Sequence, residues 1–242
     1  HCIDVANILI DWNMDHTTVV SALLHDVVED TEVKLSDIEE EFGSDVASLV
    51  DGVTKVENIA FRSKEHKQAK NFTKLFLSLA RDLRVIIIKF ADRLNNMETI
   101  QYLSSNKRKE IALETKEIFV PLAHRLGMAK LKWQLEDLSL KCLDLRAFNS
   151  IKKKIETSTR LNEDILSNAI RPIKDELNSY KIKSNIFGRY KSISSIHRKI
   201  KKSGKKFEEI YDLYAIRIIV DKIEECYLAL GVIHSIYPPL QD

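Results

Sequence analysis

The sequence lacks long apolar runs. In its 242 residues there is no stretch of about 18 or more apolar residues, the length that a membrane-spanning helix needs. The longest apolar run, Val85 to Ile88 with its neighbours, is interrupted by Lys89 and Asp92. The chain also does not open with a charged segment followed by an apolar one. We therefore expect neither a membrane span nor a signal peptide.

Cysteine is scarce as well. The three cysteines, Cys2, Cys142 and Cys226, are widely spaced and include no CxxC pair. An odd and sparse set argues against a disulfide framework and against a structural zinc knuckle. A reducing compartment is therefore expected, and the cytoplasm is the simplest one.

Glycine and proline, which usually interrupt helices, number only 6 and 4. Neither occurs between Val53 and Val120, and apolar residues in the first half recur at helical spacing. We predict helices throughout residues 3–145. The run from Val85 to Phe90 could be a buried strand, but its flanks are helical and no turn residues bound it, so we predict a helix there too.

The second half predicts a change of architecture. Residues 146–180 are rich in Lys, Glu and Asn and predict one or two connecting helices. Beyond them we predict a strand over 182–187 that ends at Gly188, a basic helix over 192–202, a strand over 213–220 and a helix over 224–236. Alternating strands and helices form an α/β unit. The expected fold is mainly α: an all-helical domain (1–145), a helical linker (146–180) and the start of an α/β domain (181–242).

Charge is distributed unevenly although the net charge is only +2. Residues 1–50 hold twelve acidic residues and one Lys, a balance of −11, whereas residues 181–206 hold ten basic residues and no acid, a balance of +10. Two solvated faces would explain these runs. The functional interpretation is that the first half concentrates carboxylates and the second binds polyphosphate.

The segment Leu23 to Asp30 (LLHDVVED) places four ionisable residues inside an apolar helix. His25 and Glu29 are four residues apart, as are Asp26 and Asp30, so each pair shares a helix face. Burying ionisable side chains next to these leucines and valines costs free energy unless an interaction partner compensates for it. A divalent cation is one, and imidazole with carboxylate suits Mn, Fe, Zn or Co.

Two further residues can complete this site. His1 opens the first predicted helix, and Asp92 follows the apolar run that ends at Phe90. Asp92, Asn96 and Thr99 lie at i, i+4 and i+7 and form one stripe. A salt-bridged core carboxylate remains an alternative for Asp92, and a satisfied buried pair remains one for His25 and Asp26.

The basic segment carries a second pattern. Gly188 to Lys191 (GRYK) follows a predicted strand and opens a basic helix, where backbone amides with Arg189 and Lys191 would form a phosphate cradle. Ser195, Arg198 and Lys199 continue the cationic face. Charge alone favours a helix that faces nucleic acid or ribosomal RNA.

The adjacent His-Asp, with an upstream His and a distant Asp, resembles the HD phosphohydrolase signature. Longer strings resemble the Rel/SpoT family of (p)ppGpp hydrolase–synthetases, in the same order along the whole chain. These strings are ALLHDVVEDT (22–31), FGSDVASLVDGVTK (42–55), IIIKFADRLNNMETI (86–100), ETKEIFVPLAHRLGMAKLKWQLEDL (114–138) and GRYKSISSIHRKI (188–200).

The resemblance implies a hydrolase site in the first domain. Its implied ligands for a metal, usually Mn²⁺, are His1, His25, Asp26 and Asp92. It makes Glu29 and Asp30 the catalytic acidic pair and places Asn96 and Thr99 near the nucleoside. The implied reaction removes the 3′-pyrophosphate of ppGpp or pppGpp to give GDP or GTP. Asn95 departs from the family, which usually has His there.

The resemblance also implies part of a nucleotidyltransferase-like synthetase, which makes (p)ppGpp from ATP and GDP or GTP. The ATP-side residues would be Arg189, Lys191, Ser195 and Lys199, and Asp212 would hold Mg²⁺. The family's acceptor motif comes later, so this segment alone should not synthesise. Ribosome contact would need a region absent from this chain.

Two other functions are compatible with parts of the pattern. The first is an HD phosphohydrolase acting on other nucleotides, against which the GRYK segment argues. The second is a regulatory module that binds a nucleotide without turnover. Metal-dependent release of pyrophosphate from ppGpp distinguishes these alternatives.

Overall fold

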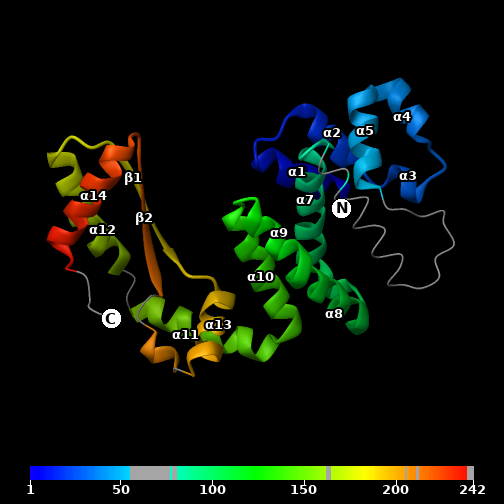
Figure 1. Cartoon of the computed structure of the whole chain (residues 1–242). Coiled ribbons are helices and arrows are strands. Elements are labelled where there is room, and N and C mark those ends of the chain that lie inside the picture. Colours follow the sequence, from blue (N-terminus) through cyan, green and yellow to red (C-terminus); the bar gives the residue numbers. More distant parts are fainter. Residues whose placement is uncertain (55–76, 78–80, 162–164, 205, 211–212, 239–242) are drawn as a thin grey trace. The chain divides into compact units, whose positions relative to one another are not determined.

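The computed structural model describes the chain except for residues 55–76, 78–80, 162–164, 205, 211–212 and 239–242 (Figure 1). It folds into two compact units, His1–Ser139 and Leu140–Asp242. No helix in the described part of the chain is long and apolar enough to cross a membrane. The three cysteines are free thiols, as their sparse spacing predicted.

Every described element of the first unit is helical, which confirms the expected class. The helices are α1 (Cys2–Asp11), α2 (His16–Leu24), α3 (Val27–Asp30), α4 (Leu35–Phe42), α5 (Ser44–Val53), α7 (Arg84–Glu98), η1 (Ile100–Tyr102), α8 (Ser105–Glu114), the π-helix η2 (Thr115–Phe119), α9 (Val120–Arg125) and the greater part of α10 (Ala129–Leu143).

Helix α7 is central to this unit and contains the apolar run that we predicted to be helical. It packs against α1, α2 and α5 (Figure 1). Ile88, Phe90 and Ala91 are fully buried on it. Burying a side chain of the size of Ile or Phe contributes about 1.5–3 kcal/mol. Because Asp92 follows directly on this buried run, packing of α7 also fixes where the Asp92 carboxylate lies.

The middle of α7 contacts the end of α8 and the π-helix. Arg93 Nη1 lies 3.2 Å from Glu114 Oε2, and its guanidinium lies 4.2 Å from the centroid of the Phe119 ring. The Phe119 ring also meets Phe90 edge to face, with centroids 6.3 Å apart. These contacts tie α7 to the segment that includes the end of α8 and the π-helix.

The second unit combines helices with a small sheet. Its elements after α10 are α11 (Leu145–Leu161), α12 (Ile165–Ser179), β1 (Ser184–Tyr190), α13 (Ile193–Ser203), η3 (Phe207–Glu209), β2 (Tyr214–Val220) and α14 (Ile223–Ile236). The strands are antiparallel, with Ser184 opposite Val220 and Tyr190 opposite Tyr214. The expected mixed second part is thereby confirmed.

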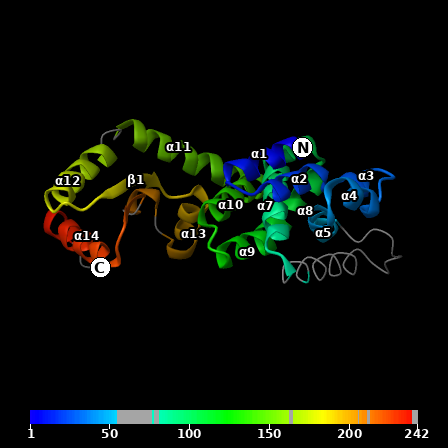
Figure 2. The same ribbon diagram turned by 90° about the horizontal axis from the view of Figure 1, so that it is seen from above.

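Both helices that we expected between the domains pack inside this second unit. Helix α12 lies beside α14 and contacts the sheet, and Ile173, Leu177 and Val232 are buried in the core between them (Figure 2). Helix α11 packs against α13, where Ile151 and Ile196 are buried.

The prediction that Gly188 ends the first strand is wrong, because β1 continues to Tyr190. A Cβ atom at Gly188 would lie 2.9 Å from the Leu166 side chain of α12. Glycine is therefore needed here for the close approach of a helix to the strand, and it does not mark a turn.

Candidate metal centre

The His-Asp pair does not lie inside one continuous helix, so that prediction is wrong. Helix α2 ends at Leu24, and α3 starts at Val27. His25 Nδ1–H donates to the carbonyl oxygen of Ala22 at 2.7 Å, which is the acceptor that the Asp26 amide would use in a continued helix. A side chain that bonds to a backbone carbonyl in this way competes with the hydrogen bonds of the helix. The pair therefore lies at a junction between two helices.

Four of the predicted residues meet at this junction. His1 Nε2 is 3.3 Å from Asp92 Oδ1 and 3.9 Å from Asp26 Oδ2. His25 Nε2 is 3.1 Å from Asp26 Oδ1. One potential ligand atom from each of His1, His25 and Asp92 lies within 4.8 Å of the other two. The cluster thus combines the N-cap residue of α1, a residue of α7 and the α2–α3 junction.

Both imidazoles present the same nitrogen to the cluster. His1 Nδ1–H donates to Asn95 Oδ1 at 2.7 Å, and His25 Nδ1–H donates to the Ala22 carbonyl. With Nδ1 occupied by an acceptor, Nε2 carries the lone pair in the neutral ring. In a metal-binding histidine, the ring nitrogen that does not bind the metal usually donates its N–H to an acceptor.

His25 Nε2 gives the strongest indication of a bound cation. The side chain is 1% exposed, and Nε2 has no hydrogen-bond partner among the described residues. Asp26 Oδ1 is close, but the two atoms are not aligned for a hydrogen bond. A buried polar atom without a partner costs about 1–3 kcal/mol, which coordination of a cation would remove. Two imidazoles and two carboxylates fit a divalent transition metal.

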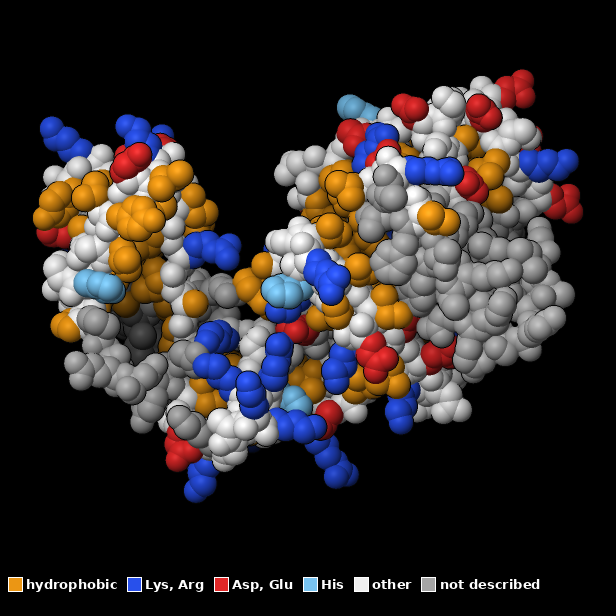
Figure 3. Space-filling view, viewed as in Figure 1, with side chains coloured by type: hydrophobic (Ala, Val, Ile, Leu, Met, Phe, Trp, Pro, Cys, Tyr) orange, Lys and Arg blue, Asp and Glu red, His pale blue; other side chains and the backbone are white. Residues whose placement is uncertain are grey.

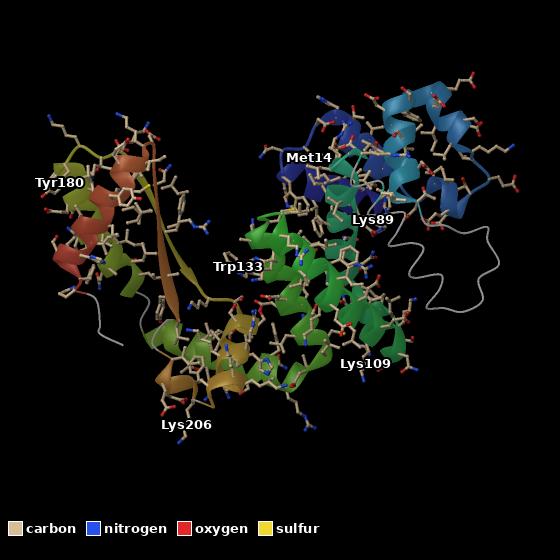
Figure 4. The ribbon with its side chains drawn as sticks, viewed as in Figure 1. Met14, Lys89, Lys109, Trp133, Tyr180 and Lys206 are labelled. Atoms are coloured by element: carbon tan, nitrogen blue, oxygen red, sulfur yellow. The ribbon has the colours of Figure 1, made fainter. Side chains whose placement is uncertain are left out.

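Neighbouring positive charges keep the Asp92 carboxyl ionised. Burial would raise the pKa of Asp92, but the charge of Lys89 and the hydrogen bond with His1 outweigh it and hold that pKa below its usual range. Lys89, on α7 in Figure 4, has its Nζ 3.5 Å from Asp92 Oδ2. The hydrogen bond with Asp92 raises the pKa of His1 to about 9, against the opposing effect of burial. When His1 is protonated, the proton on its Nε2 occupies the place where a cation would bind.

The other predicted hydrolase residues lie on α3 and in the last turn and the C-cap of α7. Glu29 is half-buried and Asp30 exposed, both on α3. Asn96 donates from Nδ2 to Asp92 Oδ1, and the exposed Thr99 donates from Oγ1 to the carbonyl of Asn95 at 2.9 Å. Asn96 and Asp92 therefore share one helix face, as their spacing predicted.

Sequence reasoning missed the roles of Asn95 and Lys89. Asn95 is 6% exposed, and from the sequence it is only a departure from the family pattern. Its neighbour Asn96 falls on the stripe with Asp92, whereas Asn95 reaches His1 through the packing of α1 on α7. Lys89 lies three residues before Asp92, a spacing that could have indicated an ion pair.

Asn95 gives a testable prediction about the cluster. Replacing it with leucine removes the acceptor for His1 Nδ1–H, so we expect metal affinity to fall about 10–100-fold, as when other outer partners of ligands are lost. Asn95→Asp retains an acceptor and should retain most of the affinity. Titration calorimetry with Mn²⁺ measures both; equal losses in the two variants would contradict a role for the acceptor.

The predicted phosphate cradle differs from the structure. Gly188 to Tyr190 belong to β1, and the amide of Lys191 donates to the Leu213 carbonyl at 2.9 Å. The GRYK segment therefore does not open the helix, and its amides are not a helix N-terminus. The cap of α13 is Ser192, whose hydroxyl lies 2.7 Å from that of Ser195.

The basic face itself is present on α13. Arg198, Lys199, Lys201 and Lys202 are exposed there, and Figure 3 shows Lys and Arg side chains gathered over this part of the second unit. Lys191 is half-buried just before the helix. Arg189 lies on β1, but its side chain is outside the described part, and Asp212 lies outside the described residues altogether.

Comparisons with known proteins agree with the two units. Residues 1–129 match the family model of the HD domain, and residues 188–242 match a region found in RelA / SpoT proteins. A guanosine-3′,5′-bis(diphosphate) 3′-pyrophosphohydrolase of Haemophilus influenzae is 40% identical over 239 residues, which are 99% of this chain and 35% of that protein. A probable GTP pyrophosphokinase of Mycobacterium leprae is 43% identical over 240 residues, 99% of this chain and 30% of that protein.

The chain thus spans about a third of the length of the curated relatives that it matches. Among solved structures, a metazoan orthologue of SpoT, described as hydrolysing ppGpp, is 28% identical. The match covers 57% of this chain and 77% of the chain of that structure, with a TM-score of 0.42.

Proposed function

This chain belongs to the HD-domain family and carries a region found in RelA / SpoT proteins, and we propose that its first unit hydrolyses the 3′-pyrophosphate of ppGpp and pppGpp. The products would be GDP or GTP and pyrophosphate. The single observation that supports this most is the unpartnered, buried Nε2 of His25 in a cluster of imidazoles and carboxylates. The names of the relatives support the choice of substrate.

We propose Mn²⁺ as the cation, held by His1, His25, Asp26 and Asp92. A bound divalent cation would polarise a phosphate oxygen and lower the pKa of a bound water. The residues of the chain do the rest. Asn95 and Ala22 orient the two imidazoles, Lys89 and Asn96 hold the Asp92 carboxylate, and Glu29 with Asp30 accepts or relays the proton.

Asn96 and Thr99 would also contact the nucleoside. They lie one turn apart at the end of α7, beyond Asp92, and Thr99 is exposed there. A nucleotide whose pyrophosphate reaches the cation would extend along this stripe. The RelA / SpoT region favours a guanine alarmone over the substrates of other HD phosphohydrolases.

The second unit would supply the ATP-binding side of a synthetase in the whole protein. The whole protein would then also be a GTP pyrophosphokinase. We assign ATP binding to Arg189, Lys191, Ser195 and Lys199, and Mg²⁺ binding to Asp212. The domain bounds proposed with these roles are 1–145 for the hydrolase, 146–180 for the linker and 181–242 for the partial synthetase. We further propose that the protein is cytoplasmic.

The decisive experiment is an assay of the full-length protein with ppGpp. We expect GDP and pyrophosphate in equal amounts when Mn²⁺ is present, and no turnover after chelation of the metal. Restoring Mn²⁺ should restore the activity. A protein that binds Mn²⁺ and ppGpp yet releases no pyrophosphate would contradict hydrolysis and favour a nucleotide-binding regulatory module.

A further inference from the structure

A sulfur atom lies beside the cation cluster. Cys2, the first residue of α1, is half-buried, and its Sγ groups with His25 and Asp26. One potential ligand atom from each of these three residues lies within 4.8 Å of the other two. His25 Nε2, buried and without a hydrogen-bond partner, is the nitrogen available to this second set of donors.

A thiolate changes which cation the donors prefer. Sulfur selects softer metals, whereas carboxylate and water suit Mn²⁺. Zinc accepts Cys, His and carboxylate ligands in a tetrahedron, with bonds of about 2.0–2.3 Å that separate neighbouring ligand atoms by about 3.5 Å. The donor atoms of Cys2, His25 and Asp26 lie within 4.8 Å of one another, so small side-chain movements would bring them to the spacing of a zinc site.

We propose that Cys2, His25 and Asp26 form a zinc site that overlaps the site of the catalytic cation. His25 belongs to both sets of donors but has only one free nitrogen, because its Nδ1 is bonded to Ala22. The two cations therefore exclude each other. On binding, the Cys2 thiol loses its proton to solvent and forms one Zn–S bond, with no change of oxidation state.

Occupancy of this site has a consequence for turnover. A cation held by Cys2 leaves His1 and Asp92 without the metal that they would otherwise share with His25. Zinc therefore competes with the catalytic cation and inhibits hydrolysis. The inhibition rests on the proposed function, whereas the zinc site itself does not.

Cobalt tests the sulfur ligand directly, in the metal-free full-length protein. With one equivalent of Co²⁺, we expect a thiolate-to-cobalt charge-transfer band in the near ultraviolet. The band should be lost in Cys2→Ser and in Cys2→Ala and retained in Cys142→Ser, which removes another half-buried thiol. Circular dichroism checks that the variants fold. A band that persists in both Cys2 variants, or that is absent from the parent protein, overturns the proposal.

Zinc affinity and inhibition complete the test. In calorimetry, Cys2→Ser should lower zinc affinity about tenfold or more, because a direct ligand contributes at least as much as an outer partner. The zinc concentration that halves each variant's own hydrolysis should rise by a similar factor, and Cys142→Ser should behave as the parent. Unchanged zinc affinity in Cys2→Ser contradicts the proposal. Because the cobalt band requires no turnover, a failure of hydrolysis alone leaves the zinc site supported.

Discussion

Replacing His25 with alanine is expected to abolish cation binding and, with it, hydrolysis of ppGpp. His25 supplies the buried Nε2 that has no hydrogen-bond partner in the described chain. Loss of a direct ligand should exceed the roughly 10–100-fold that loss of an outer partner costs. Titration calorimetry with Mn²⁺ and a pyrophosphate-release assay measure the two effects.

The matched control for this change is His16→Ala. His16 begins the same helix, α2, but it is exposed and outside the cluster. It should keep both metal affinity and turnover. Because His25 is almost fully buried, thermal unfolding of both variants separates lost binding from lost folding. A folded His25→Ala protein that binds Mn²⁺ as tightly as the parent would remove His25 from the ligand set.

Changing Glu29 to glutamine is expected to lower turnover about 10²–10⁴-fold, the usual contribution of a positioned acid or base. Glutamine keeps the size and the hydrogen-bonding capacity of the side chain but not the ability to take a proton. Metal affinity should therefore change little. Steady-state kinetics at saturating Mn²⁺ and calorimetry give the two quantities.

Glu32→Gln is the control for this prediction, because Glu32 is an exposed acid just beyond α3. It should behave as the parent protein. Asp30→Asn tests the other member of the acidic pair at an exposed position. If Glu29→Gln instead loses metal affinity as severely as turnover, Glu29 belongs among the metal ligands and another group handles the proton.

Local spacing predicted much of this site. The i, i+4 relation of Asp92 and Asn96 holds in α7, where they share a hydrogen bond. The His-Asp pair and the distant Asp were singled out because ionisable residues interrupt apolar runs. These inferences depend only on helical periodicity and on the cost of burying charge, which act over a few residues.

Local spacing failed where a side chain or a neighbouring helix competes with the backbone. The helix through Leu23 to Asp30 is broken because the His25 ring takes the carbonyl of Ala22. Strand β1 runs through Gly188, where the close approach of α12 leaves no room for a Cβ atom. Neither event leaves a signal in the propensity of the residues concerned.

By itself the sequence determined the helical first part, the mixed second part and the residue types that a cation centre needs, because periodicity, scarce Gly and Pro, and charge placement are local properties. Only the tertiary structure decided which donors meet. His1 reaches Asp92 and Asn95 because α1 packs on α7, and the packing of α1 against α2 brings Cys2 near His25 and Asp26. Contacts between residues so distant in sequence depend on how whole helices bury their apolar faces against each other, which no local pattern specifies.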